Sequence, residues 1–571
     1  MLVKRSLVVI SIDRSTTIYE ALNRAVHAYP DNCFLATPSI LTHLPNSLQL
    51  TYRQVLHQVE ELKIRYEEAG FGMGHRIGVF LENRLDALLH KLAINSLGAC
   101  CVPINPDYGP HELAYVIDHA NVDLFLVLDT RLQQLMNGIH EAKAQPPVIT
   151  LERFCSHLPS PYRQAKTTTP SSETIASILY TSGTTGRPKG CLLSHRYELA
   201  AGAWYATRGG EMKIRTGQER LYNPLPLFHV NASVLSFYCM MLTGGCYIQA
   251  ERFQPTRWWG DIRQSKATIV HYLGVIVAML MNQPIDSQET NHCVRFGAGA
   301  GVEPTLHAAF EKRFGIPLVE LWGMTEIVRI LTDNESPRQV GTRAIGRSQL
   351  GLEVRVVDSV GNDVPDGSAG EMLLRSSEED PRQDFFSGYL DDEEATAEAW
   401  RGGWFHTGDI VKRAADGMIY FLDRQKNIIR RSGENIAAAE IEAYLQVHPL
   451  VHQVAVVAVP DEVREEEVFA CIVLNRSTVI DGVAGSITEF DAARILFEYC
   501  MAGLAYFKAP GWIWCPETIP VTATQKVQKH QIFSQGIDPR TMEGVFDMRL
   551  FKNRKKVKDQ KAADVPLAST T

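Results

Sequence analysis

Apolar residues near the N-terminus alternate between helical spacing and short uninterrupted runs. Helical spacing extends over residues 55–66 and stops at Gly70, and the apolar run 77–81 predicts a buried strand. Asn83 is placed to cap a helix that reaches Ser96. The order of these elements predicts a strand followed by a helix that returns the chain to the same sheet.

The same pattern continues along the next residues. The apolar runs 100–104 and 122–128 predict two more strands, and residues 111–119 between them predict a helix. Strands that alternate with helices in this way pair in parallel. The N-terminal region is therefore predicted to be an α/β structure.

The C-terminal half changes character at the polar segment 423–427. Before it, short strands are predicted at residues 352–358, 371–375 and 418–422; after it follow a helix from residue 438, strands at 454–459 and 468–474, and a helix at 491–504. We expect an N-terminal domain (1–424), a hinge (425–426), a C-terminal α/β domain (427–545) and a basic, disordered tail (546–571).

Bulk composition fits an enzyme with several cores. The chain has 571 residues, of which 45% are apolar. A net charge of −8 and a pI of about 6.2 argue against nucleic-acid binding. No apolar run is long enough to span a membrane. The eleven cysteines are scattered without metal-type spacing, so we expect a reduced, cytoplasmic setting.

A glycine- and hydroxyl-rich loop follows the apolar run 175–180. It reads Thr181, Ser182, Gly183, Thr184, Thr185, Gly186, Arg187, Pro188, Lys189, Gly190. Glycines let backbone N–H groups approach an anion closely, the hydroxyls add donors, and Lys189 adds positive charge. The loop lacks the G-K-[ST] ending of a Walker A motif. It predicts a phosphate site of another kind, and an ordinary surface turn is the weaker interpretation.

Residues 180–190 resemble the signature of the adenylate-forming superfamily, which contains acyl-CoA synthetases, peptide-synthetase adenylation domains and beetle luciferases. Further similar motifs extend from about Thr17 to Lys529, and residues 222–232 resemble the crotonobetaine/carnitine-CoA ligase-like branch of stand-alone acyl-CoA ligases. The resemblance implies an α/β fold. The implied fold has a large N-terminal domain of helix-flanked sheets with a small β-barrel-like subdomain, and a small mobile C-terminal α/β domain.

The resemblance also implies a nucleotide and metal site. In the segment 321–326, Trp322 offers a flat face for adenine, Thr325 a donor for the α-phosphate, and Glu326 an oxygen ligand for Mg²⁺. The neighbouring residues assigned to the nucleotide are Gly323, Met324, Ala298, Gly299 and Ala300. The last three are small enough to let backbone approach a ligand, although close packing against a helix is a second explanation.

Two further residues match a ribose site. Asp409, in the sequence Thr-Gly-Asp, can accept hydrogen bonds from both ribose hydroxyls, and Arg424 would hold the same ribose or a phosphate. An isolated Thr-Gly-Asp is usually an ordinary turn. The assignment therefore rests on its place between the other motifs.

The acid is expected to bind near His229. The resemblance makes His229 a gate beside the carboxylate, not a general base, because a carboxylate is already ionised at neutral pH. Candidates for the acyl pocket are Trp204, His229, Tyr272, Gly274, Gly299, Met324 and Ile330. This mixed apolar set suits aromatic, medium-chain or terpenoid acids.

Two lysines divide the expected mechanism. Lys526 matches the lysine that draws the carboxylate and the α-phosphate together, and Lys426 matches a hinge. Rotation about that hinge would bring Arg430, Gly433 and Glu434 to a pantetheine tunnel. Gln525 departs from the pattern, which normally has glycine before the catalytic lysine.

These motifs predict an ATP- and Mg²⁺-dependent ligase that joins a small carboxylic acid to CoA in two steps. Its expected partners are the acid, ATP and CoA, and a homodimer is one assembly that the sequence allows. An acyl-AMP ligase that loads a carrier protein in trans is one alternative, and a luciferase-like oxidase is another. A catalytically silent acyl-nucleotide-binding protein is the third, suggested by Gln525.

Overall fold

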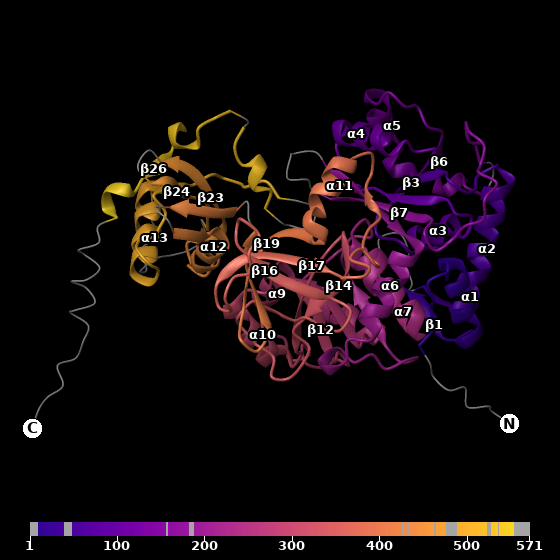
Figure 1. Cartoon of the computed structure of the whole chain (residues 1–571), viewed down its shortest axis with the longest axis horizontal. Coiled ribbons are helices and arrows are strands. Elements are labelled where there is room, and N and C mark those ends of the chain that lie inside the picture. Colours follow the sequence, from indigo (N-terminus) through magenta and orange to yellow (C-terminus); the bar gives the residue numbers. More distant parts are fainter. Residues whose placement is uncertain are drawn as a thin grey trace, which may run out of the picture. The chain divides into compact units, whose positions relative to one another are not determined.

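The computed structural model describes residues 9–38, 48–155, 158–181, 188–424, 427–431, 434–461, 464–475, 488–521, 527–534 and 536–552 (Figure 1). The chain divides into two compact units. Unit 1 consists of Met1–Arg355, Leu373–His406 and Ala414–Tyr420; unit 2 consists of Val356–Met372, Thr407–Arg413 and Phe421–Thr571. The molecule is a mixed α/β protein with several sheets, as the sequence predicts.

A seven-stranded sheet in unit 1 contains the predicted βαβ segments. Its order is β18-β8-β7-β4-β3-β5-β6, and β3, β4, β5 and β6 are parallel. The strands are β3 (Arg76–Phe80), β4 (Cys100–Pro103), β5 (Leu124–Val127), β6 (Val148–Thr150), β7 (Ile175–Thr181), β8 (Lys189–Ser194) and β18 (Gly388–Tyr389). The helices around it are α2 (Tyr52–Glu68), α3 (Leu85–Ser96), α4 (Pro110–Ala120) and α5 (Leu132–Glu141) (Figure 1).

One predicted helix cap is wrong. Helix α3 begins after Arg84, without a side-chain cap, and Asn83 bonds a distant segment instead. The Asn83 side chain accepts from the Leu227 N–H at 2.9 Å and donates to the Leu225 carbonyl at 3.2 Å. A tertiary contact therefore takes the side chain that local capping rules assign to the helix.

An eight-stranded sheet forms the second layer of unit 1. Its order is β14-β13-β12-β11-β9-β10-β1-β2. The strands are β1 (Cys33–Ala36), β2 (Gln49–Thr51), β9 (Arg220–Asn223), β10 (Cys246–Gln249), β11 (Ile269–Leu273), β12 (Phe296–Ala300), β13 (Leu318–Met324) and β14 (Ile327–Thr332). Its helices are α1 (Ile18–Ala28), α6 (His195–Ala206), α7 (Phe237–Thr243), α8 (Trp258–Ser265), α9 (Gly274–Met281) and α10 (Pro304–Phe314).

A five-stranded sheet contains the short strands expected between residues 352 and 422. Its order is β15-β20-β19-β17-β16. The strands are β15 (Ala344–Arg347), β16 (Glu353–Val357), β17 (Ala369–Arg375), β19 (Phe405–Arg413) and β20 (Met418–Arg424). A short helix, α11 (Glu393–Ala399), precedes β19.

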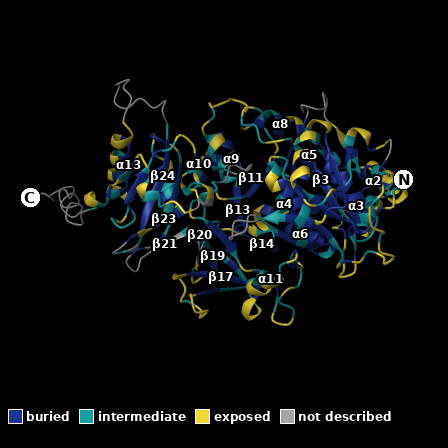
Figure 2. Ribbon diagram, turned by 90° about the horizontal axis from the view of Figure 1, so that it is seen from above, coloured by how far each residue is buried: buried dark blue, intermediate teal, exposed yellow. Residues whose placement is uncertain are grey.

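Unit 2 has its own sheet and core. Helices α12 (Ala438–Gln446) and α13 (Glu489–Gly503) contribute to an apolar cluster with strands β23 and β24. The sheet's strands are β21 (Ile428–Arg431), β22 (Glu434–Ala437), β23 (Val451–Asp461), β24 (Glu465–Leu474), β25 (Trp512–Trp514) and β26 (Val545–Asp547). Buried residues follow the strands, and exposed residues lie mainly on the outer helices and loops (Figure 2).

The first residues of the predicted tail are folded. Strand β26 pairs with β25, and the Lys552 ammonium lies 2.7 Å from the buried Glu467 carboxylate. Burial lowers the pKa of Lys552 to about 8, and the Glu467 carboxylate partly offsets this effect. Residues 553–571 lie outside the described part. Within the described part, no helix combines the length and apolarity needed to cross a membrane.

Candidate active site

The predicted phosphate loop joins two antiparallel strands of unit 1. Strand β7 ends at Thr181 and β8 begins at Lys189, and these two residues are cross-strand partners. The two ends of the loop are therefore held side by side. The residues between them that the sequence assigns to phosphate, Ser182, Gly183, Thr184, Thr185 and Gly186, lie outside the described residues.

Thr325 and Glu326 form the turn of a second hairpin. Met324 of β13 pairs with Ile327 of β14, which leaves these two residues at the tip. The Tyr197 hydroxyl donates to the Thr325 carbonyl at 2.7 Å. The Glu326 side chain is buried and accepts from the Tyr389 hydroxyl at 2.9 Å. Two phenols thus fix the turn.

Tyr389 connects this turn to the phosphate loop. Strand β18 pairs with β8, so Tyr389 lies opposite Cys191 and close to the loop's C-terminal end. The Lys189 ammonium lies 4.7 Å from the centre of the Tyr389 ring. Burial, together with the Glu326 carboxylate, raises the pKa of Tyr389, so its hydroxyl stays protonated and donates.

Parallel strands bring other predicted residues to one edge of the eight-stranded sheet. Strands β9, β11, β12 and β13 are parallel, so the segments after their carboxyl ends meet at the same edge. Ala298, Gly299 and Ala300 belong to strand β12. A Cβ on Gly299 would overlap the Tyr272 carbonyl, and one on Gly274 would overlap the Gly301 carbonyl. Close approach of backbone therefore requires glycine at both positions.

Glu320 fixes the loop that follows β12. Its buried carboxylate accepts from the N–H groups of Gly301 and Val302 at 3.1 and 3.0 Å, and from the Tyr272 hydroxyl at 3.2 Å. Burial raises the pKa of Glu320 to about 7. Sequence patterns did not predict this role, because all three donors come from other segments of the chain.

His229 follows β9 in a tightly bonded segment. The Asn83 bonds hold Leu225 and Leu227 just before it, and the His229 carbonyl accepts from the Ser233 hydroxyl at 3.0 Å. A π-helix, η4 (Asn231–Ser236), begins two residues later. Such π-turns are frequent at functional sites. The half-buried His229 ring lies 4.5 Å from the Phe228 ring.

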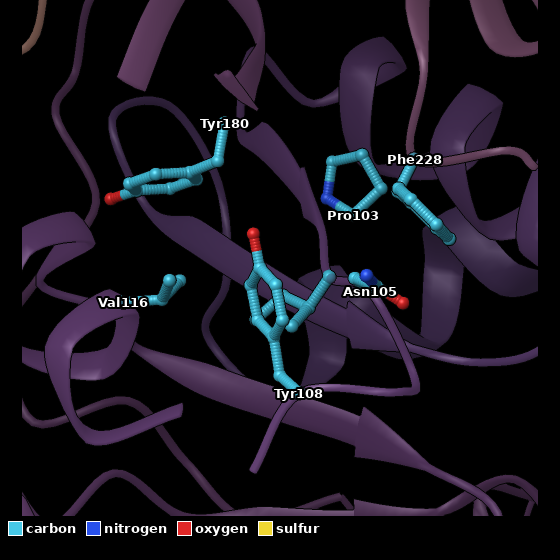
Figure 3. A pocket seen from close by; sticks show the side chains of 7 residues that line it. Pro103, Asn105, Tyr108, Val116, Tyr180 and Phe228 are labelled. Atoms are coloured by element: carbon cyan, nitrogen blue, oxygen red, sulfur yellow. The ribbon is translucent and has the colours of Figure 1, made fainter. Parts of the chain in front are cut away.

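A small hollow lies beside the residue before this segment and the residue before Thr181. Tyr180, which precedes Thr181, and Phe228, which precedes His229, both line it. In Figure 3 these two rings lie on opposite sides of the Tyr108 ring. The remaining lining residues are Pro103, Ile104, Asn105 and Val116. The hollow therefore adjoins two predicted functional segments.

Trp204 and Ile330 of the expected acyl pocket are in direct contact. The Trp204 indole N–H, on α6, donates to the Ile330 carbonyl of β14 at 2.9 Å. Met324 is half-buried near the hairpin turn, and Trp322 is buried within β13. Gly323 lies against Ile330, because a Cβ on Gly323 would lie 2.8 Å from the Ile330 side chain.

The expected ribose residues meet in unit 2. The Arg424 Nε lies 2.6 Å from Asp409 Oδ1, and Asp409 is fully buried. Gly408 before it has a φ of 65°, a left-handed conformation that favours glycine.

The expected second-step residues are only partly described. Arg430 lies in β21, where its backbone is opposite Asn435, and Glu434 begins β22. Gly433, the hinge Lys426 and the catalytic Lys526 lie outside the described residues.

Two sequence profiles match the chain. The profile of the AMP-binding enzyme family matches residues 22–390, and that of the AMP-binding enzyme C-terminal domain matches residues 440–526. The chain belongs to the AMP-binding enzyme family. These matches include the phosphate loop and the Thr325–Glu326 turn in the first profile, and Lys526 at the end of the second.

This AMP-binding enzyme is similar to curated CoA ligases. It is 30% identical to the sulfoacetate–CoA ligase of Cupriavidus necator, over 89% of this chain and 95% of that protein. It is 28% identical to the crotonobetaine/carnitine–CoA ligase of Salmonella paratyphi A, over 85% of this chain and 93% of that protein.

Solved structures share its fold. The ATP-bound MatB from Rhodopseudomonas palustris superposes with a TM-score of 0.74 at 22% identity, covering 90% of this chain and 98% of that one. The o-succinylbenzoate CoA synthetase from Bacillus subtilis, in complex with its acyl-adenylate intermediate, gives 0.76 at 20% identity, covering 91% and 98%. The fold is thus that of adenylate-forming enzymes with a large N-terminal and a smaller C-terminal domain.

Proposed function

We propose that this AMP-binding enzyme is an ATP- and Mg²⁺-dependent acid:CoA ligase. A carboxylate oxygen of the acid attacks the α-phosphorus of ATP, and the bond to the pyrophosphate oxygen breaks. The CoA thiol then loses its proton and attacks the acyl carbonyl, which releases AMP. One observation carries the proposal: Tyr389 connects the proposed metal ligand to the phosphate loop. Its hydroxyl donates to Glu326, and its ring lies beside Lys189. The family and the names of its relatives support it.

These contacts indicate which residues would bind the phosphates of ATP. Lys189 and the loop before it would neutralise the phosphates, and Thr325 would donate to the α-phosphate. Glu326 would hold Mg²⁺ together with phosphate oxygens, since Mg²⁺ is commonly bound by one or two carboxylates plus substrate phosphates. A buried carboxylate at a turn held by two phenols suits that role. Bound Mg²⁺ supplies charge neutralisation at the phosphates.

Glu326 would act without a preformed protein cage. Within the described ranges, no group of three or more His, Cys, Asp or Glu side chains is arranged to hold a metal. A single carboxylate next to a phosphate site fits a metal that arrives with ATP.

The remaining site residues are assigned to the other parts of the substrates. Trp322, Gly323, Met324 and the strand residues Ala298, Gly299 and Ala300 would bind adenine and the acyl group. Asp409 and Arg424 would bind the ribose. His229 would gate the carboxylate, within an acyl pocket formed by Trp204, Tyr272, Gly274, Gly299, Met324 and Ile330.

Two half-reactions would use different residues of the C-terminal domain. Lys526 would serve adenylation, and rotation about Lys426 would replace it with Arg430, Gly433 and Glu434 for thiol transfer. We keep the domain limits 1–424 and 427–545 as part of this proposal. A homodimer is a further hypothesis, which sedimentation velocity tests.

Exchange of labelled pyrophosphate into ATP across a panel of carboxylic acids tests the first step, and thioester formation with free CoA tests the second. Exchange without thioester would instead favour an enzyme that loads a carrier protein. No exchange with any acid would favour a silent binding protein and contradict the proposal.

Lys526→Ala should lower the adenylation rate by about a hundredfold or more, as expected when a charge that stabilises the transition state is removed. It should leave thioester formation from supplied acyl-adenylate intact. Lys529→Ala is the matched control, because Lys529 already pairs with Glu442 at 2.8 Å. Equal loss of both half-reactions in Lys526→Ala would contradict the division of labour.

A further inference from the structure

Two arginines share one half-buried acidic side chain beside α6, and a third arginine, Arg208, follows the C-terminal end of that helix. Arg329 and Arg196 each lie 2.7 Å from a different oxygen of Asp384. The Arg208 guanidinium lies 3.6 Å from the centre of the Trp204 ring, and Arg208 is only 8% exposed. Asp384 is thus already shared by two cations, and Arg208 lies at the same indole ring as one of them, Arg329.

Among the described residues, Arg208 donates hydrogen bonds only to neutral groups. Its Nε donates to the Trp204 carbonyl at 2.7 Å, one terminal nitrogen donates to the Gln349 amide oxygen, and the other donates to the Thr207 hydroxyl at 3.3 Å. No Asp or Glu of the described segments lies within ion-pair distance of it. Burial and the nearby Arg329 lower the pKa of Arg208 to about 10, which leaves it charged at neutral pH. A buried cation without a counter-charge is unfavourable.

The position of Arg208 relates it to the acid site. Helix α6 runs beside β14, because Tyr197 contacts the Thr325 carbonyl and Trp204 contacts the Ile330 carbonyl. Seven residues separate Tyr197 from Trp204, a rise of about 10 Å along a helix. The Arg208 guanidinium stacks on Trp204, so it lies about that far from the Thr325 turn, where the α-phosphate that the carboxylate attacks is proposed to bind.

We propose that the acid substrate carries a second anionic group, a carboxylate or a sulfonate, and that this group binds Arg208. The proposal rests on the proposed function and defines its substrate class. The second anion would replace the amide oxygen of the half-exposed Gln349 and supply the negative charge that Arg208 lacks. Trp204 would lie along the spacer between the two anionic ends.

A series of acids tests two features of the substrate together: the length of the spacer between its anionic groups and the presence of the second negative charge. Adenylation is measured by pyrophosphate release with α,ω-dicarboxylic acids from succinic to dodecanedioic acid, and with the monocarboxylic acids of equal carbon number. We expect kcat/KM for a diacid of intermediate length to exceed that of its matched monoacid by about ten- to a hundredfold, the value of one charge-assisted hydrogen bond. A preference for monoacids at every length would overturn the proposal.

Gln349→Glu tests the site within the protein. The new carboxylate would pair with Arg208 and compete with the second anion, so the diacid-to-monoacid ratio of kcat/KM should fall about tenfold or more. This ratio does not depend on the fraction of folded enzyme. Gln133→Glu, at an exposed position of α5, adds the same charge elsewhere and should leave the ratio unchanged.

Further outcomes separate this inference from the proposed function. An unchanged ratio in Gln349→Glu would overturn the subsite while leaving the ligase activity standing. A raised KM for CoA with unchanged acid kinetics would assign the anion to a CoA phosphate and also overturn it. If no acid is turned over, the proposed function fails, and the diacid-induced shift in melting temperature decides the subsite. A shift in wild type that is lost in Gln349→Glu supports it, and no shift contradicts it.

Discussion

The two ends of the proposed acid site handle charge in different ways. At the Thr325–Glu326 turn, the neutral phenols of Tyr197 and Tyr389 hold the backbone and the carboxylate in place. At Trp204, two guanidinium groups lie against one indole ring, and Arg208 has no acidic partner in the described part of the chain. Neutral donors hold the side chains of the first end in place, whereas the second end carries more positive charge than its acidic partners neutralise.

This difference indicates what each end binds. Neutral donors fix geometry without neutralising a carboxylate, which suits a residue that must keep its charge for a metal. A surplus of buried guanidinium groups suits a ligand that brings its own negative charge. Removing the Glu326 charge at the first end should therefore lower the adenylation rate most. Adding a negative charge beside Arg208 at the second end should most change the preference for the acid substrate.

The largest effect is expected for Glu326→Gln. Loss of the proposed metal ligand should lower the adenylation rate at saturating ATP by about a hundredfold or more, beyond the ten- to hundredfold typical of groups that only support a ligand. Titration of the rate with Mg²⁺ should show a raised requirement. Glu152→Gln, an exposed carboxylate that accepts only the Asp129 N–H, is the control. Unchanged Mg²⁺ dependence would contradict the metal assignment.

A smaller effect is expected for Tyr389→Phe. The ring beside Lys189 remains, but Glu326 loses its hydrogen bond, so the Mg²⁺ requirement should rise by about tenfold while KM for the acid stays the same. The exposed Tyr162→Phe should have no effect. If KM for the acid changes as much as the Mg²⁺ requirement, Tyr389 is a general packing residue and the two ends are not independent.

Sequence periodicity predicted elements better than it predicted contacts. Strands β3 to β5 and helices α2 to α4 follow directly from apolar spacing, because each must bury one face against the sheet. The phosphate loop and the Thr325–Glu326 turn were found from local motifs, and their assigned roles stay predictions. Tyr389 and Glu320 were missed because their partners are distant in sequence. Asn83 was assigned to a helix cap for the same reason.

The smallest effect on catalysis is expected from Glu320, a second carboxylate held by neutral donors, whose role is in stability. Its pKa lies at about 7 in the folded protein and near 4.5 when exposed. The unfolded chain therefore loses this proton at lower pH than the folded protein does. Between about pH 4.5 and 7 the free energy of unfolding should fall by about 3 kcal/mol through this group, and above pH 7 it should not change further.

Glu320→Gln should abolish this part of the pH dependence, because an amide does not ionise in that range. Its Oε1 can still accept from Val302 and Tyr272, whereas the Gly301 N–H loses its acceptor, so stability at pH 5 should drop by about 1 kcal/mol. Urea unfolding of both proteins at pH 5 and pH 7.5 measures the difference. Parallel pH profiles would show that Glu320 is ionised throughout. The neutral donors around a buried carboxylate would then suffice to keep it charged, as proposed for Glu326.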